Sequence, residues 1–186
     1  MRQALFTIAL VMLAMGAAIL TVPGPSAAAT AEEIDREVQS ALESLYTKSA
    51  SAKTMGEKAK GILVFPSIVK GGFIVGGQYG EGAMLENGQP RGYYNTIQVS
   101  YGLQAGLQKY GYALFFMTDS ALGYLQGSKG WELGVGPTIT VIDTGAARAA
   151  TTTTLKSEIY AFFFNEKGLM GGLGIQGTKI SKVRKK

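Results

Sequence analysis

Residues 59–82 read AKGILVFPSIVKGGFIVGGQYGEG, and this stretch is the strongest indication of the fold. Its continuous apolar run, Ile62–Phe65, is short enough to be a buried strand, and Pro66 is expected to stop it. Glycines recur after the proline, where they mark bends, bulges or the close approach of another backbone. A strongly curved sheet needs such features. The stretch therefore predicts a curved or barrel-like, Gly-rich, mainly antiparallel β-sheet.

The rest of the chain supplies more strands and one short helix. Apolar residues alternate with Gly and Gln over 101–108, which is typical of a strand. Asp119 or Ser120 can cap a short helix that ends at Gly127. Further strands are expected over residues 112–117, 133–142, 159–164 and 171–180.

Upstream of the strands the pattern is helical. Thr30 and Glu33 have the spacing of a capping box, and apolar residues then recur every three or four positions up to Leu45. A second short helix is expected over 51–60. The region after residue 29 is thus expected to be one α+β domain with its N-terminal helices packed on the sheet. It would be helical over 30–60, mainly β over 61–180, and end in a basic tail at 181–186.

The first 29 residues have the order of a secretory signal peptide. A basic start is followed by an apolar run over residues 4–20, a Pro-Gly-Pro break and then alanines. Ala27 and Ala29 fit the small residues that precede a cleavage site, so we expect cleavage after Ala29. The apolar run is about 17 residues, at the lower edge for a membrane span, so a retained anchor is the alternative. Cleavage would give an exported, periplasmic protein.

The residue types available argue against catalysis. The 186-residue chain has no histidine and no cysteine, which removes the commonest general base, the thiolate nucleophile and the usual zinc ligands. We therefore expect no enzyme activity, no metal and no cofactor. Glu81 and Glu86 are close in sequence, but in a glycine-rich turn they are interpreted as solvated loop charges. Gly172, Gly174 and Gly177 spell G-x-G-x-x-G, yet a dinucleotide site needs a helix after it, which the basic C-terminal end does not suggest.

The positive charge is concentrated at the C-terminus. The chain carries a formal charge of +5, and five of the last eight residues are basic. Such a cluster favours a phosphate-bearing partner, although a solvated, frayed terminus is the alternative. The aromatic residues interleave with aliphatic rather than basic ones, so we expect them in the core and expect no nucleic-acid partner.

Several motifs resemble the SYLF family. The residues 59–66 and 70–82 resemble its signature, and SYGLQAG at 100–106 resembles its S-x-G-x-Q-x-G segment. LGVG at 133–136 with Gly145 resembles its Gly-rich middle. Its closing strands are matched by residues 159–161, 167–169, 172 and 176–177, so the resemblance extends from about Ala52 to Ile180.

The resemblance implies a lipid-binding domain. Eukaryotic family members bind phosphoinositides and couple membranes to actin beside a second module, whereas bacterial members are mostly small exported proteins. This sequence shows neither a partner module nor a lipidation cysteine, so actin coupling is not expected. The implied partner is a membrane surface with anionic phospholipid or phosphoinositide-like headgroups, to which the protein would attach peripherally. The competing hypothesis is a non-enzymatic envelope scaffold that binds other proteins.

Two groups of basic residues are candidates for lipid contact. Lys60 and Lys70 lie on the signature and flank the buried strand, where they could contact phosphates as point charges. Alternatively, they are edge lysines that prevent strand-to-strand aggregation. The second group is the C-terminal cluster, which consists of Lys179, Lys182, Arg184, Lys185 and Lys186.

Overall fold

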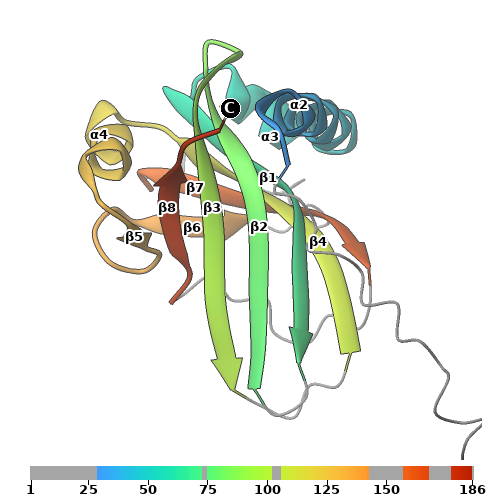
Figure 1. Cartoon of the computed structure of the whole chain (residues 1–186). Coiled ribbons are helices and arrows are strands. Elements are labelled where there is room, and N and C mark those ends of the chain that lie inside the picture. Colours follow the sequence, from blue (N-terminus) through green and yellow to red (C-terminus); the bar gives the residue numbers. More distant parts are fainter. Residues whose placement is uncertain (1–28, 73–74, 102–105, 143–156, 168–176, 186) are drawn as a thin grey trace, which may run out of the picture.

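The structure is a computed structural model that describes residues 29–72, 75–101, 106–142, 157–167 and 177–185. Its helices are α2 (Ala31–Lys48), α3 (Ala50–Gly56) and α4 (Asp119–Gly127), labelled as in Figure 1. The long strands are β1 (Gly61–Gly72), β2 (Val75–Glu86), β3 (Gln89–Tyr101) and β4 (Gly106–Phe116). The shorter strands are β5 (Trp131–Glu132), β6 (Ile139–Ile142), β7 (Ile159–Lys167) and β8 (Lys179–Val183).

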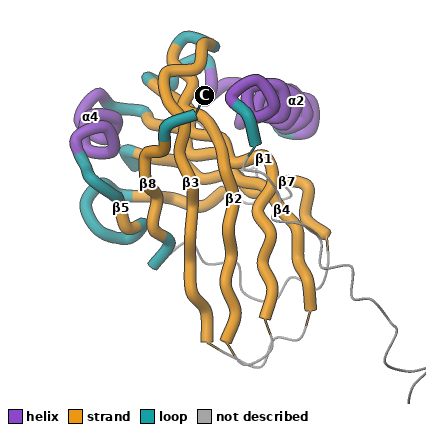
Figure 2. Tube along the Cα trace, viewed as in Figure 1, coloured by secondary structure: helices purple, strands orange, loops and turns teal. Residues whose placement is uncertain are grey.

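The eight strands form one open, strongly curled sheet in the order β5-β8-β3-β2-β1-β4-β7-β6. All neighbours are antiparallel except β6 and β7. Helices α2 and α3 lie across one face of the sheet, near one end of the four long strands (Figures 1 and 2). We call this the outer face and the opposite one the inner face. The predicted α+β fold, a curved, mainly antiparallel sheet with N-terminal helices packed on it, is confirmed.

The apolar run Ile62–Phe65 of β1 is buried on both faces, which explains why it is continuous. Ile62 and Val64 pack on the outer face in a cluster with the apolar stripe of α2. Leu63 and Phe65 point to the inner face, where they join a cluster closed by α4 and Trp131. The stripe of α2 consists of Ile34, Val38, Ala41, Leu42 and Leu45, and the predicted capping box at its start is present.

Pro66 does not stop β1, contrary to the prediction. The strand continues to Gly72 through a bulge, seen as a register shift between Val64 and Ser67 against β2. Proline has no N–H to donate, and a bulge is one of the few places where a sheet tolerates it. The extra residue also changes the phase of the strand. Ile68 therefore points to the inner face, and Val69 to the outer one.

Gly82 shows why β2 is rich in glycine. A Cβ at Gly82 would collide with the carbonyl oxygen of Val64 and would lie 2.8 Å from Cδ1 of Phe65. The backbone of β1 thus presses against β2 beside the bulge, and only glycine leaves room. The expectation that strand glycines mark close approach is confirmed here.

Several predicted boundaries were wrong. The second helix ends at Gly56 rather than residue 60, and Thr118 caps α4 in place of Asp119 or Ser120. The ends of the predicted strand 101–108 belong to two strands, since β3 ends at Tyr101 and β4 begins at Gly106, and residues 102–105 lie outside the described part. Residues 133–138 form turns before β6. The last strand covers 179–183 where 171–180 was predicted, and residues 171–176 lie outside the described part.

Within the described residues, none of the helices has the length and apolar character needed to cross a membrane. Residues 1–28 lie outside that part of the chain. Removal of the leader therefore stays a prediction.

Gly82→Ala should destabilise the protein by about 1–3 kcal/mol, because the new Cβ forces β1 and β2 apart at the bulge. Gly77→Ala is the matched control in the same strand, since its Cβ would meet its nearest atom, the Gln98 carbonyl oxygen, at an ordinary 3.8 Å. Thermal unfolding of both variants measures the difference. Equal melting temperatures would contradict the close-approach explanation.

Candidate functional site

The two signature lysines do not form one site. Lys60 immediately precedes β1, with its Nζ 3.7 Å from Oδ2 of Asp119 at the start of α4. Lys70 lies near the other end of β1, and ten residues of strand separate the two by about 30 Å. They flank the apolar run Ile62–Phe65, but Lys70 lies within β1. Because β1 is central in the sheet, the edge-lysine interpretation is wrong.

The predicted basic tail is not a free tail. Lys179 and Lys182 belong to β8, in register with Ile97 and Tyr94 of β3, and lie on opposite faces. Pairing with β3 and burial of Ile180 in the inner cluster hold this segment in the sheet. Arg184 is exposed, and Lys186 lies outside the described residues. The structure therefore does not bring the seven predicted lipid-contacting residues together.

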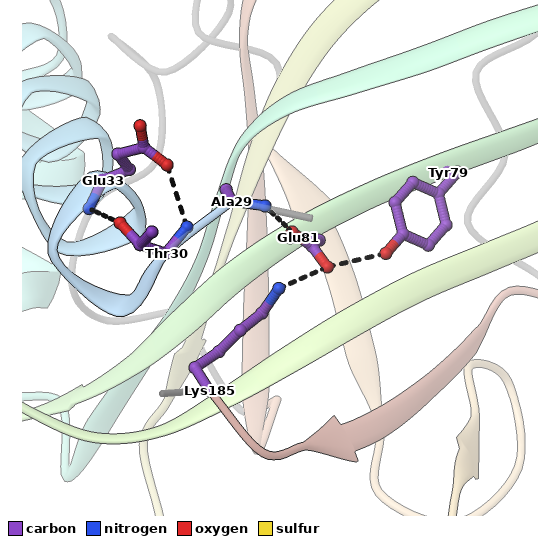
Figure 3. A network of polar contacts seen from close by, with 6 residues as sticks. All are labelled: Ala29, Thr30, Glu33, Tyr79, Glu81 and Lys185. Atoms are coloured by element: carbon purple, nitrogen blue, oxygen red, sulfur yellow. Dashed lines mark hydrogen bonds and ion pairs between the residues drawn. The ribbon is translucent and has the colours of Figure 1, made fainter. Parts of the chain in front are cut away.

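Lys185 is used inside the domain. Its side chain is 8% exposed and its Nζ lies 2.7 Å from Oε1 of Glu81, which is 13% exposed. The same oxygen accepts a hydrogen bond from the Tyr79 hydroxyl at 2.7 Å, and Oε2 accepts one from the Ala29 backbone N–H at 3.2 Å (Figure 3). Glu81 is thus not the solvated loop charge that the sequence suggested. It lies within β2 and binds residues from both ends of the described chain.

This network shifts the pKa values of Glu81 and Tyr79. Burial alone would raise the pKa of Glu81, but the bonds from Lys185, Tyr79 and Ala29 hold the pKa below its ordinary 4.5. Burial and the neighbouring carboxylate raise the pKa of Tyr79 to about 12. At neutral pH the network is therefore a carboxylate that binds an ammonium group and a neutral phenol.

The outer face carries an exposed row of apolar side chains. Val69, Tyr79 and Ile97 are direct register neighbours on β1, β2 and β3, and their exposed fractions are 44%, 48% and 44%. The register continues to Lys109 on β4 at one end and Lys179 on β8 at the other. We call these five residues the exposed row. Val99, two residues beyond Ile97 on the same face, is 59% exposed.

A groove of about 830 Å³ lies beside this row, between α2 and strands β1, β4 and β7. Three cations line it, Arg36 and Lys48 from α2 and Lys109 from the row, against one carboxylate, Glu37. Neither of the ion pairs found in the described part of the chain uses any of the three cations. Its other lining residues are Ser40, Ala41, Ser44, Pro66, Ser67, Tyr110 and Asn165. We call this the basic groove.

Part of the basic groove could have been found in the sequence. Arg36, Ser40, Ser44 and Lys48 recur every four residues and so form one row along α2. Lys109, in contrast, joins them only because the sheet carries β4 beneath the helix. Lys48 also donates a hydrogen bond of 3.5 Å to Oδ1 of Asn165 on β7, an interaction across 117 residues.

The described residues offer no evident cofactor or metal site. Gly177 of the G-x-G-x-x-G motif is followed by strand β8 and not by a helix, so the motif lacks the context of a dinucleotide site, as predicted. No three carboxylates of the described chain converge as metal ligands would.

Glu81→Gln should destabilise the protein by about 1–3 kcal/mol at pH 7, since Lys185 would keep its charge without a carboxylate partner. The folded-state pKa of Glu81 is lowered, so its stabilising effect is present above its ordinary pKa and lost as the pH falls through the folded-state value. The gap in melting temperature between wild type and variant should therefore narrow as the pH falls below about 4. Glu43→Gln, on the exposed side of α2, is the control. A gap that does not depend on pH would contradict this role.

The sequence was compared with known protein families and with curated proteins. Residues 97–186, which include β4 to β8 and the end of β3, match the model of a family described as Ysc84, Las17-binding protein actin regulator. A search of curated proteins found no match. The family match covers the C-terminal half of the domain, and the motifs at 59–82 lie on β1 and β2 of the same sheet. The match over residues 97–186 is consistent with a protein of the Ysc84, or SYLF, family.

Proposed function

We propose that this protein is an exported lipid-binding protein that attaches peripherally to anionic phospholipid surfaces through the outer face of its sheet. The observation that carries the proposal is the exposed row, in which three apolar side chains lie side by side between two lysines. The family match supports lipid binding as the class of function. The signal-peptide pattern of the first 29 residues supports export.

The exposed row has the chemistry of a membrane-facing surface. Contiguous exposed apolar groups with a charged rim mark interaction sites. Four strand intervals separate Lys109 from Lys179, so the row is about 19 Å wide. Tyr79 presents an aromatic ring to this surface, while its hydroxyl donates to Glu81 within the protein. Apolar contact and lysine–phosphate attraction would then act together.

The basic groove supplies the charge next to this surface. Lys109 belongs to both features, so a lipid headgroup in the groove would lie at the end of the exposed row. Four cations line the groove or end the row. Three carboxylates oppose them: Glu37 in the groove lining, Glu33 through its electrostatic interaction with Arg36, and Glu132 in register with Lys179. The surface therefore keeps an excess of positive charge. Each such charge contributes about 1 kcal/mol near an anionic membrane.

Liposome flotation tests the electrostatic part. The double variant Lys109→Gln/Lys179→Gln should bind vesicles of phosphatidylcholine with an anionic phospholipid at least tenfold more weakly, since about 2 kcal/mol is lost. Lys53→Gln/Lys129→Gln, which removes two exposed lysines elsewhere, should bind like the wild type. Salt at about 0.5 M should reproduce much of the loss. Equal binding of both double variants would contradict the assignment of this face.

The apolar contribution to liposome binding is tested by a second pair of variants, one on the exposed surface and one control. Val99→Ser should weaken binding by about 1 kcal/mol, or roughly fivefold, because less apolar surface leaves water. Val141→Ser on β6 is the control, because Val141 is also an exposed strand valine, at 50% against 59% for Val99. If wild type binds no vesicles of any composition, the envelope-scaffold hypothesis replaces the lipid one.

A further inference from the structure

We infer that export cleaves the chain between Ala28 and Ala29 and that the new α-ammonium group of Ala29 binds Glu81. This inference rests on the export proposed above and adds a defined processing site with a partner for the new chain end. It differs by one residue from the cleavage after Ala29 that the sequence pattern favoured.

The contacts at the start of α2 distinguish the two cleavage positions. The Ala29 nitrogen donates to Oε2 of Glu81 at 3.2 Å, and the Thr30 nitrogen donates to Oε2 of Glu33 at 2.9 Å as part of the capping box. Cleavage before Ala29 leaves both contacts in place. Cleavage after Ala29 removes the donor to Glu81 and turns the Thr30 amide of the capping box into a charged chain end.

The electrostatics favour the same position. A terminal amine is protonated at neutral pH, and a charge-assisted hydrogen bond is roughly twice as strong as a neutral one. On Ala29 this charge would lie beside the carboxylate of Glu81. On Thr30 it would lie beside the Glu33 carboxylate, but that pair is exposed to water and more strongly screened than the part-buried Glu81. It would also lie on the N-cap of α2, where the helix dipole is positive and repels cations.

Glu81 has room for this second cation. Its Oε1 is shared by Lys185 and Tyr79, whereas the only donor to Oε2 in the described structure is Ala29 (Figure 3). In the processed chain, each carboxylate oxygen of Glu81 would thus bind one cation, Lys185 on Oε1 and the Ala29 amine on Oε2. Glu81 of β2 would then hold both Ala29 and Lys185. The small residues that must precede a cleavage site are present for both positions. Ser26 and Ala28 provide them for cleavage after Ala28, and Ala27 and Ala29 provide them for cleavage after Ala29.

The cleavage position can be read directly. The full chain with its leader is expressed in a bacterium and purified from the cell envelope, and its intact mass and N-terminal sequence are determined. The expected first residue is Ala29. A mature chain that begins at Thr30 or further on overturns the inference, and a retained leader overturns both the inference and the export proposal. Liposome binding of the same material reports separately on lipid attachment.

The ion pair needs a second measurement. Two preparations that begin at Ala29 are compared, one with a free amine and one with that amine acetylated, in wild type and in Glu81→Gln. Acetylation should lower the wild-type melting temperature by about 2–4 °C and leave that of Glu81→Gln unchanged. Glu33→Gln is the control, in which acetylation should act as in wild type. Equal melting of the two wild-type preparations overturns the ion pair, even if Glu81→Gln does not fold.

Discussion

Burial of the run Ile62–Phe65 of β1 on both faces is the constraint on which the rest of the structure depends. A strand whose neighbouring side chains, such as Val64 and Phe65, both need an apolar environment must be covered on each side. The α2–α3 pair covers the outer side, and the curl of the sheet with α4 covers the inner one. Because one cover precedes β1 in the sequence and α4 follows it, the central strand holds together the N-terminal helices and α4.

The bulge at Pro66 determines which side chains of β1 reach the outer surface. It shifts the phase of β1, so that Ile68 fills the inner cluster while Val69 turns to the outer face. Without the shift, Val69 would point inward and the exposed row would lose its member on β1. Gly82 lets β1 bulge against β2 at the same place. The bulge that accommodates Pro66 in the sheet thus also creates the apolar surface that we assign to lipid binding.

Charge density along the sequence was a poor guide to charge density in space. Of the C-terminal cluster, Lys185 is neutralised by Glu81, and Lys179 and Lys182 lie on opposite faces of β8. Meanwhile, Arg36, Lys48 and Lys109, spread over 74 positions, line one groove. A strand sends successive side chains to opposite faces, so it disperses a local cluster, while sheet pairing brings distant residues together.

The sequence by itself determined the elements whose signals are local. Spacing fixed the capping box and stripe of α2, the apolar run fixed the buried strand, and the glycines indicated a curved sheet. What only the tertiary structure decided was which side chains meet: Glu81 with Lys185 across 104 residues, and Lys109 with the cations of α2. These encounters depend on strand order, register and the phase shift at Pro66. All three are set by how the whole core packs, and no local pattern carries that information.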